Sequence, residues 1–151
     1  LSTMKTHEGM LGTHGLTQRS HRSYDLERTG WPSLNKQPKR VDYVGHCWFF
    51  KREWLQYLWK ELPPTWDNGE DIQFSYCLQR YANIQTYVPP HPPGNLELHG
   101  SLLGAELGID DKATSNNIAK SHQEFFTERD VCVKHAFDNG WYTVNKRKWR
   151  N

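Results

Sequence analysis

The sequence predicts a mixed α/β fold in which helices pack on a small mixed sheet, and three patterns along the chain support this class. Residues 41–50 (VDYVGHCWFF) are rich in β-branched and aromatic side chains, which is typical of a mostly buried strand. Apolar residues recur at helical spacing from Phe74 onward, so we expect an amphipathic helix that begins near Glu70. Residues 84–88 (IQTYV) predict a second strand, which ends at the prolines that follow.

Two more helices are indicated by apolar spacing and by residues that stop a helix. Residues 51–62 (KREWLQYLWKEL) carry apolar side chains three and four positions apart, Trp59 among them, and the following pair of prolines ends this helix. Residues 127–140 (TERDVCVKHAFDNG) predict another helix, with Thr127 as its N-terminal cap and Gly140 as its C-terminal stop. Elements of both kinds therefore fill the chain from residue 41 onward.

The chain is expected to divide into a loop-rich N-terminal segment, residues 1–40, and a folded portion, residues 41–151. Its length of 151 residues fits one domain with one core. Residues 9–16 (GMLGTHGL) contain three glycines and predict a short strand or turn. Residues 18–40 predict a mobile loop, because two prolines and the charged run KQPKR disfavour regular structure.

Charge and composition restrict the partners that we expect. With 19 basic and 17 acidic residues the net charge is only +2, so nucleic acid is not expected as a partner. The basic cluster NKRKWR (145–150) is interpreted as a solvated terminus. No run of 18 apolar residues occurs, so no membrane segment is expected. Aromatic residues make up 13% of the chain, which favours a surface that binds sugars or peptides in addition to an aromatic core.

The stretch WDNGEDIQFSY, residues 66–76, carries the candidate site. Glu70 and Asp71 are adjacent carboxylates that follow an Asn-Gly turn and open the predicted helix. One interpretation is a helix cap, since acids in a first helical turn are stabilised by roughly 0.3–1 kcal/mol. The other is a catalytic base, because a helix N-terminus keeps a carboxylate ionised and able to accept a proton. We expect both acids at the rim of a groove that Trp66 also touches, with its ring free to stack on a sugar.

Three segments resemble the acceptor-side half of GT-A fold glycosyltransferases: VDYVGHCWFFKREWL (41–55), WDNGEDIQFSYCLQRY (66–81) and TYVPPHP (86–92). The resemblance extends over roughly residues 41–115. It implies an enzyme that transfers a sugar from a nucleotide-sugar donor to a hydroxyl group of a carbohydrate or glycoconjugate acceptor.

The resemblance also implies roles for the residues of the Gly-Glu-Asp motif and its surroundings. Asp71 matches the position of the catalytic base in inverting members, and Glu70 beside it is expected to contact acceptor or sugar. Trp66, Asn68 and Gly69 are expected to bind substrate from the loop that precedes the helix.

A divalent metal, Mn²⁺ or Mg²⁺, is the cofactor that the resemblance implies. Family members often supply a histidine to this metal some tens of residues after the Glu-Asp motif. His91, between the prolines of PPHPP, lies at about that distance, and His99 is the second candidate. The flanking prolines stiffen the backbone around His91, which favours a fixed ligand.

The sequence also departs from the family, because it contains no Asp-x-Asp motif. In the family those two acids bind the metal that bridges the donor phosphates, a task suited to oxygen ligands. The nearest match, YDLE at 24–27, follows no apolar strand. We therefore expect that the N-terminal nucleotide-binding half is missing from these residues. The alternatives are a non-catalytic carbohydrate-binding or interaction module and, third, a metal-dependent hydrolase that uses Asp71 and His91.

Overall fold

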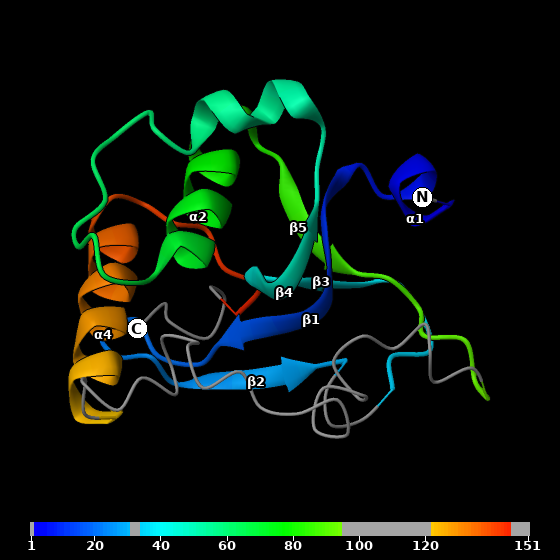
Figure 1. The fold of residues 1–151 in the computed structure, drawn as a ribbon, viewed down its shortest axis with the longest axis horizontal. Coiled ribbons are helices and arrows are strands. Elements are labelled where there is room, and N and C mark those ends of the chain that lie inside the picture. The colour runs from blue at the N-terminus through cyan, green and yellow to red at the C-terminus, as the bar shows by residue number, and fades with distance from the viewer. Residues whose placement is uncertain (1, 31–33, 95–121, 146–151) are drawn as a thin grey trace.

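A curled mixed sheet with helices packed on it forms the described part of the chain (Figure 1). The computed structural model describes residues 2–30, 34–94 and 122–145, except for the side chain of residue 46. Its elements are α1 (Ser2–Thr6), β1 (Gly9–Gln18), β2 (Leu26–Thr29), β3 (Lys39–Val41), β4 (Tyr43–Phe49), the 3₁₀ helix η1 (Arg52–Tyr57), α2 (Glu70–Ala82), β5 (Gln85–Val88) and α4 (His122–Asp138). The predicted mixed α/β class, with a small mixed sheet and packed helices, is confirmed.

Strand β1 is the central strand of the sheet. Leu16 pairs with Arg28 of β2 and with Tyr43 of β4, so these two strands lie on opposite edges of β1. The first residues of β1 pair with β5 in parallel, and β5 in turn pairs with β3 in antiparallel orientation. The sheet is therefore mixed, and β2, β4 and β5 all pair with β1.

The prediction of a loop-rich segment over residues 1–40 is wrong, since β1 and β2 lie within it and its boundary falls inside β3. Of the short strand or turn predicted over residues 9–16, the strand is confirmed as β1, and its glycines allow close packing. A Cβ atom on Gly12 would lie 2.4 Å from Cβ of Val44, and one on Gly15 would lie 2.4 Å from a methyl carbon of Val88. Glycine in a strand interior marks such close approaches.

The strand expected over residues 41–50 is present but is interrupted at Asp42. The chain leaves β3 at Val41 and enters β4 at Tyr43. Between them the main-chain N–H of Asp42 donates to the carbonyl of Leu16, 2.9 Å away. The strand expected over 84–88 is confirmed as β5, and the helix expected from Glu70 is confirmed as α2.

The helix expected over residues 51–62 is only partly confirmed. The chain forms a short 3₁₀ helix that ends at Tyr57, and within it Trp54 is buried. Trp59 and Leu62, which helical spacing predicted to pack inward, are exposed beyond its end. The early end of η1 turns this part of the chain outward before the two prolines are reached.

The C-terminal helix α4 begins at His122, ahead of the predicted cap at Thr127. The hydroxyl of Thr127 instead donates to the carbonyl of Gln123, 2.8 Å away, as a residue inside a helix does. The predicted stop is confirmed, because the chain leaves the helix through Gly140 with φ of 86°.

Helix α2 is the centre of the core. Every residue from Asp71 to Leu78 is buried, because the sheet packs on one side of the helix and α4 on another (Figure 1). The cluster that joins α2 to α4 comprises Leu16, Tyr43, Ile72, Tyr76, Cys77, Cys132, Val133, Ala136 and Trp141. The cluster between α2 and the sheet comprises Met10, Val41, Val44, Trp54, Phe74, Leu78 and Val88.

Within the described ranges, every helix is too short or too polar to cross a membrane.

Candidate functional site

The loop-to-helix junction at the start of α2 positions the candidate site. Gly69 caps the helix with φ of 93°, a left-handed conformation that favours glycine, and its carbonyl accepts the N–H of Gln73 at 2.9 Å. A Cβ atom at Gly69 would lie 2.4 Å from Sγ of Cys132 on α4. The predicted position of Glu70 and Asp71 in the first turn of a helix is confirmed.

A surface groove of about 240 Å³ opens beside this junction. Its lining comes from the end of η1, the connecting loop and the first turn of α2, and comprises Leu58, Trp59, Pro63, Thr65, Trp66, Asp67, Asn68, Glu70 and Gln73. The rings of Trp59 and Trp66 are stacked, with centroids 6.0 Å apart and planes 19° from parallel. Both side chains are exposed, at 61% and 73%, so their outer faces are open to solvent.

Asp71 does not line this groove. Its carboxylate is buried against α4, where Nη2 of Arg129 donates to Oδ1 at 2.9 Å and to Oδ2 at 2.7 Å. Asp71 is 8% exposed and Arg129 is 5% exposed. The expectation that both acids stand at the groove rim is therefore correct for Glu70 and wrong for Asp71. Consecutive residues of a helix point about 100° apart, which separates the two carboxylates.

Aromatic rings surround Arg129 and hold its guanidinium in place. The guanidinium carbon lies 4.4 Å from the ring centre of Tyr24 and 5.5 Å from that of Phe125. Burial acts to lower the pKa of Arg129, but the charge of Asp71, the hydrogen bonds to it and the nearby hydroxyl groups of Tyr24 and Tyr43 together raise the pKa above its usual range. The ion pair ties the first turn of α2 to α4.

Asn68 and Gly69, predicted to bind substrate, serve the fold as well. The side-chain amide of Asn68 donates to the carboxylate of Glu128, and the main-chain carbonyl of Asn68 accepts from Sγ of Cys132 at 3.7 Å. Asn68 is 8% exposed, and its Oδ1 atom has no hydrogen-bond partner among the described residues. Asn68 therefore joins the groove wall to α4, whereas Gly69 forms the turn that sets the direction of α2.

The predicted metal ligand His91 is buried, and both of its ring nitrogens have protein partners. Nδ1 accepts the main-chain N–H of Asn35 at 3.1 Å, and Nε2 lies 3.0 Å from the carbonyl of Thr13. Because a carbonyl only accepts, Nε2 carries the proton, and the ring is held as the neutral tautomer. The second candidate, His99, lies outside the described residues.

The described residues do not fit a Mn²⁺ or Mg²⁺ site in this arrangement. These ions prefer several oxygen ligands, and no group of three or more His, Cys, Asp or Glu side chains gathers within the described ranges. The two ring nitrogens of His91 are engaged by the main chain of Asn35 and Thr13. The metal implied by the sequence stays a prediction.

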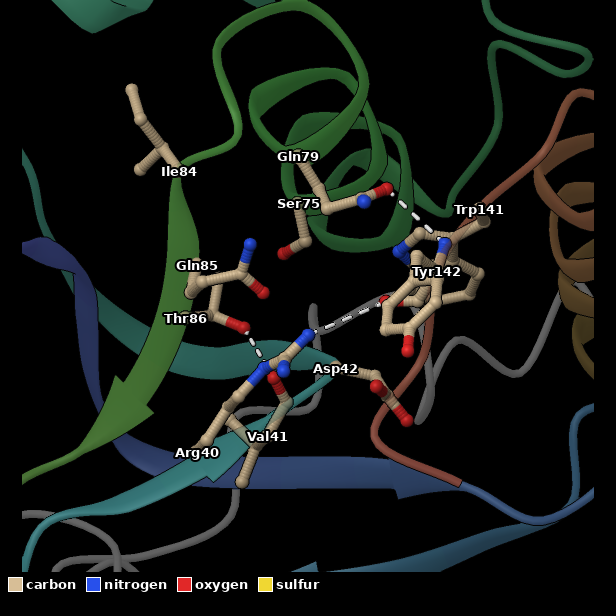
Figure 2. Close-up of a pocket in the computed structure, with 10 residues that line it drawn as sticks. All are labelled: Arg40, Val41, Asp42, Ser75, Gln79, Ile84, Gln85, Thr86, Trp141 and Tyr142. Carbon is tan, nitrogen blue, oxygen red and sulfur yellow. Dashed lines mark hydrogen bonds between the residues drawn. The ribbon is translucent and has the colours of Figure 1, made fainter. Parts of the chain in front are cut away.

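A second, much smaller cavity lies where α2, β3, β5 and the segment after α4 meet (Figure 2). Its volume of about 10 Å³ is about the size needed for one water molecule. Figure 2 shows Asp42 at one side and Arg40 reaching across toward Tyr142, whose carbonyl accepts from the guanidinium at 3.4 Å. A cavity this small excludes an organic substrate.

Asp42 is a buried carboxylate that sequence reasoning missed. The main-chain N–H groups of Gln18 and Val144 donate to it at 2.7 and 2.6 Å, so it joins β1 to the segment after α4. Burial raises the pKa of Asp42 from its ordinary 3.8 to about 6, and these two hydrogen bonds oppose the rise. The available signal was an acid set between Val41 and Tyr43 in an otherwise apolar strand.

Two other site residues, Trp59 and Arg129, were also missed. Trp59 was predicted as part of the apolar spacing of a helix that ends before it. Arg129 shares the buried face of α4 with Cys132, Val133 and Ala136, at spacings of three, four and seven. A charged residue on an apolar helical face needs a partner, and this spacing was the signal that could have identified it.

Comparison of the chain with protein-family models, with curated proteins and with solved structures gives no match. The candidate site is therefore argued from its own geometry.

Proposed function

We propose that this chain is the acceptor-side portion of a GT-A-like glycosyltransferase, which transfers a sugar from a nucleotide-sugar to a hydroxyl group of a carbohydrate or glycoconjugate. The observation that carries the proposal is the groove that combines two exposed, stacked tryptophans with Glu70 at a helix N-terminus. In this proposal the donor-binding half, together with the Mn²⁺ or Mg²⁺ ion, belongs to residues other than those described.

The groove has the two kinds of surface that a sugar requires. The C–H face of a pyranose packs on an aromatic ring, and the exposed faces of Trp59 and Trp66 supply such a surface. Sugar hydroxyls donate hydrogen bonds, and Glu70 supplies an exposed carboxylate that accepts them. A binding site is typically an apolar surface with a few placed polar groups, as here.

Glu70 and Asp71 have different roles in this proposal. Glu70 faces the groove and orients the acceptor hydroxyl. Asp71 is the base that the sequence predicts, but its carboxylate is hydrogen-bonded to Arg129. Proton transfer to Asp71 therefore requires that the Asp71–Arg129 pair opens. A general base must come within about 2.6–3.2 Å of the proton that it removes, although such geometry often forms only in the substrate complex.

The second candidate is a non-catalytic carbohydrate-binding or interaction module. The Asp71–Arg129 ion pair favours it, because a buried carboxylate held by a guanidinium serves the fold without any chemistry. In that case the groove binds sugar and no residue of the first turn of α2 acts as a base.

Sugar transfer by the complete protein that contains these residues separates the two candidates. The variant Asp71→Asn removes the base, whereas Arg129→Lys loosens the same ion pair and keeps the carboxylate. We expect Asp71→Asn to lower kcat by roughly 100-fold, the scale of a lost general base, and Arg129→Lys to lower it less than about tenfold. Glu70→Gln is expected to raise the acceptor KM more than it lowers kcat.

Circular dichroism and urea unfolding of each variant provide the control, so that turnover is compared only between folded proteins. Equal losses of kcat in Asp71→Asn and Arg129→Lys would assign a structural role to the pair and remove the base role of Asp71. Absence of transfer with every nucleotide-sugar tried, with saccharide binding retained, would favour the non-catalytic module.

A further inference from the structure

We infer that the groove beside α2 is a subsite for an uncharged pyranose, which lies flat on the outer face of the Trp59–Trp66 pair, and that Asp67 and Glu70 make it reject acidic sugars. The role of this subsite as an acceptor site rests on the proposed function. Binding of a neutral sugar in the groove does not, because it needs no donor.

The geometry of the tryptophan pair allows a sugar ring to lie on an outer face of the pair, here called the platform, but not between the two indole rings. Carbon atoms in contact are about 3.5–4.0 Å apart, so a sugar ring held between two aromatic rings needs roughly 7–8 Å between them. The centroids of Trp59 and Trp66 are 6.0 Å apart and their planes differ by 19°. The rings pack on each other, and only their outer surfaces accept a sugar.

Polar atoms that accept hydrogen bonds stand beside this platform. Asp67 and Glu70 line the groove with exposed carboxylates. Both carboxylates accept hydrogen bonds from sugar hydroxyls.

Charge decides which sugars fit. No Lys or Arg is among the described residues that line the groove, whereas two carboxylates are. A uronic acid replaces the exocyclic CH₂OH group of a hexose with a third carboxylate. At about 4 Å in water each like-charge contact weakens binding by roughly fivefold, so two contacts weaken it by tenfold or more. The groove therefore discriminates between sugars of the same shape by charge.

Titration of residues 1–151 with matched pairs of glycosides tests this inference. Methyl glucoside, methyl galactoside and methyl mannoside are each compared with the corresponding methyl uronoside, and binding is followed through the tryptophan indole N–H signals in NMR spectra. We expect at least one neutral glycoside to bind with Kd of about 10 mM or tighter, and its uronoside to bind at least tenfold more weakly.

Variants identify the residues responsible. Trp66→Ala should weaken binding of the neutral glycoside by at least about fivefold, since it removes half of the platform. The matched control is Leu62→Ala, because Leu62 is exposed nearby and does not line the groove. In the double variant Asp67→Asn/Glu70→Gln the uronoside should approach the affinity of its neutral counterpart to within about threefold.

Three results would overturn the inference: no neutral glycoside binds, a uronoside binds as tightly as its partner, or Leu62→Ala weakens binding as much as Trp66→Ala does. The proposed function fails separately, if the complete protein transfers no sugar while the groove still binds neutral glycosides as described. Transfer to an acceptor that does not compete with the glycosides would keep the enzyme and reject this subsite.

Discussion

Glu70 and Asp71 are neighbours in the sequence with the same chemical group, yet they belong to different parts of the molecule. Glu70 is exposed and lines a groove with two stacked tryptophans. Asp71 is buried and ion-paired with Arg129 on α4. The difference shows that the Glu-Asp sequence does not by itself define a site of two cooperating acids. The helical rotation between consecutive residues assigns one to the surface and one to the core.

This contrast also separates the two interpretations of the motif. Asp71 binds α4 and accepts the N–H of Ile72 at 2.8 Å, so in this arrangement its carboxylate stabilises the fold, and a role as base requires that the pair opens. Glu70 retains an open position for a ligand. The first turn of α2 therefore combines a stabilising contact with a binding surface, in adjacent residues.

Breaking the ion pair is the strongest test of this comparison. Arg129→Met leaves the carboxylate of Asp71 buried without its partner, and removal of one member of such a pair typically costs about 3–5 kcal/mol. We expect that loss in the free energy of unfolding, measured by urea denaturation. The double variant Asp71→Asn/Arg129→Met should recover at least about 1.5 kcal/mol, because no unpaired charge remains.

The matched control is Glu70→Gln, one residue away. Because Glu70 is exposed, we expect a change in the free energy of unfolding of less than about 0.5 kcal/mol. A loss of similar size in Arg129→Met and Glu70→Gln would contradict the division between a buried and an exposed acid.

Asp42 sharpens the comparison, since it is a buried carboxylate held by N–H groups instead of by a cation. Its pKa is raised to about 6 in the folded protein, so the folded state binds the proton more tightly than the unfolded state. The contribution of Asp42 to the free energy of unfolding should therefore be highest below pH 4 and fall as the pH rises from about 4 to 6. The shift corresponds to a fall of roughly 3 kcal/mol.

Urea unfolding between pH 4 and 7 measures this dependence for the natural chain and for Asp42→Asn. The variant cannot titrate at this position, so the difference between the two curves isolates Asp42 from the other titrating groups. Parallel curves would show that Asp42 is ionised over the whole range and that its burial has no effect on its proton affinity.

The turn that aims α2 is tested at Gly69, with the smallest expected effect. An alanine there must adopt φ of 93° and place its Cβ against Cys132, so Gly69→Ala should lower the free energy of unfolding by about 2–3 kcal/mol. Gly140→Ala is the matched control: its φ is 86°, but nothing lies within 4 Å of the added Cβ. We expect a loss of only about 1–2 kcal/mol there, and equal losses at the two sites would remove the packing argument.

Local signals in the sequence were enough to predict several elements. Helix α2 was predictable because an Asn-Gly turn precedes a clear helical spacing, and β5 because prolines follow a short β-rich run. Strand β1 was predicted only as a short strand or turn over residues 9–16, because it is buried with glycines and polar residues in it and shows no alternation. The early end of η1, which exposes Trp59, has no local signal comparable to the two prolines that follow.

The sequence alone determined the mixed α/β class, the helix that starts at Glu70 and the presence of a tryptophan beside two acids, because these depend on local spacing and turn chemistry. Only the tertiary structure decided which of the two acids faces the groove. It also decided three contacts: the ion pair of Asp71 with Arg129, the hydrogen bonds of His91 with Thr13 and Asn35, and the stacking of Trp59 on Trp66. Each of these contacts, except the last, joins residues more than 50 positions apart. Contacts between distant segments depend on how whole elements pack, which no local pattern specifies.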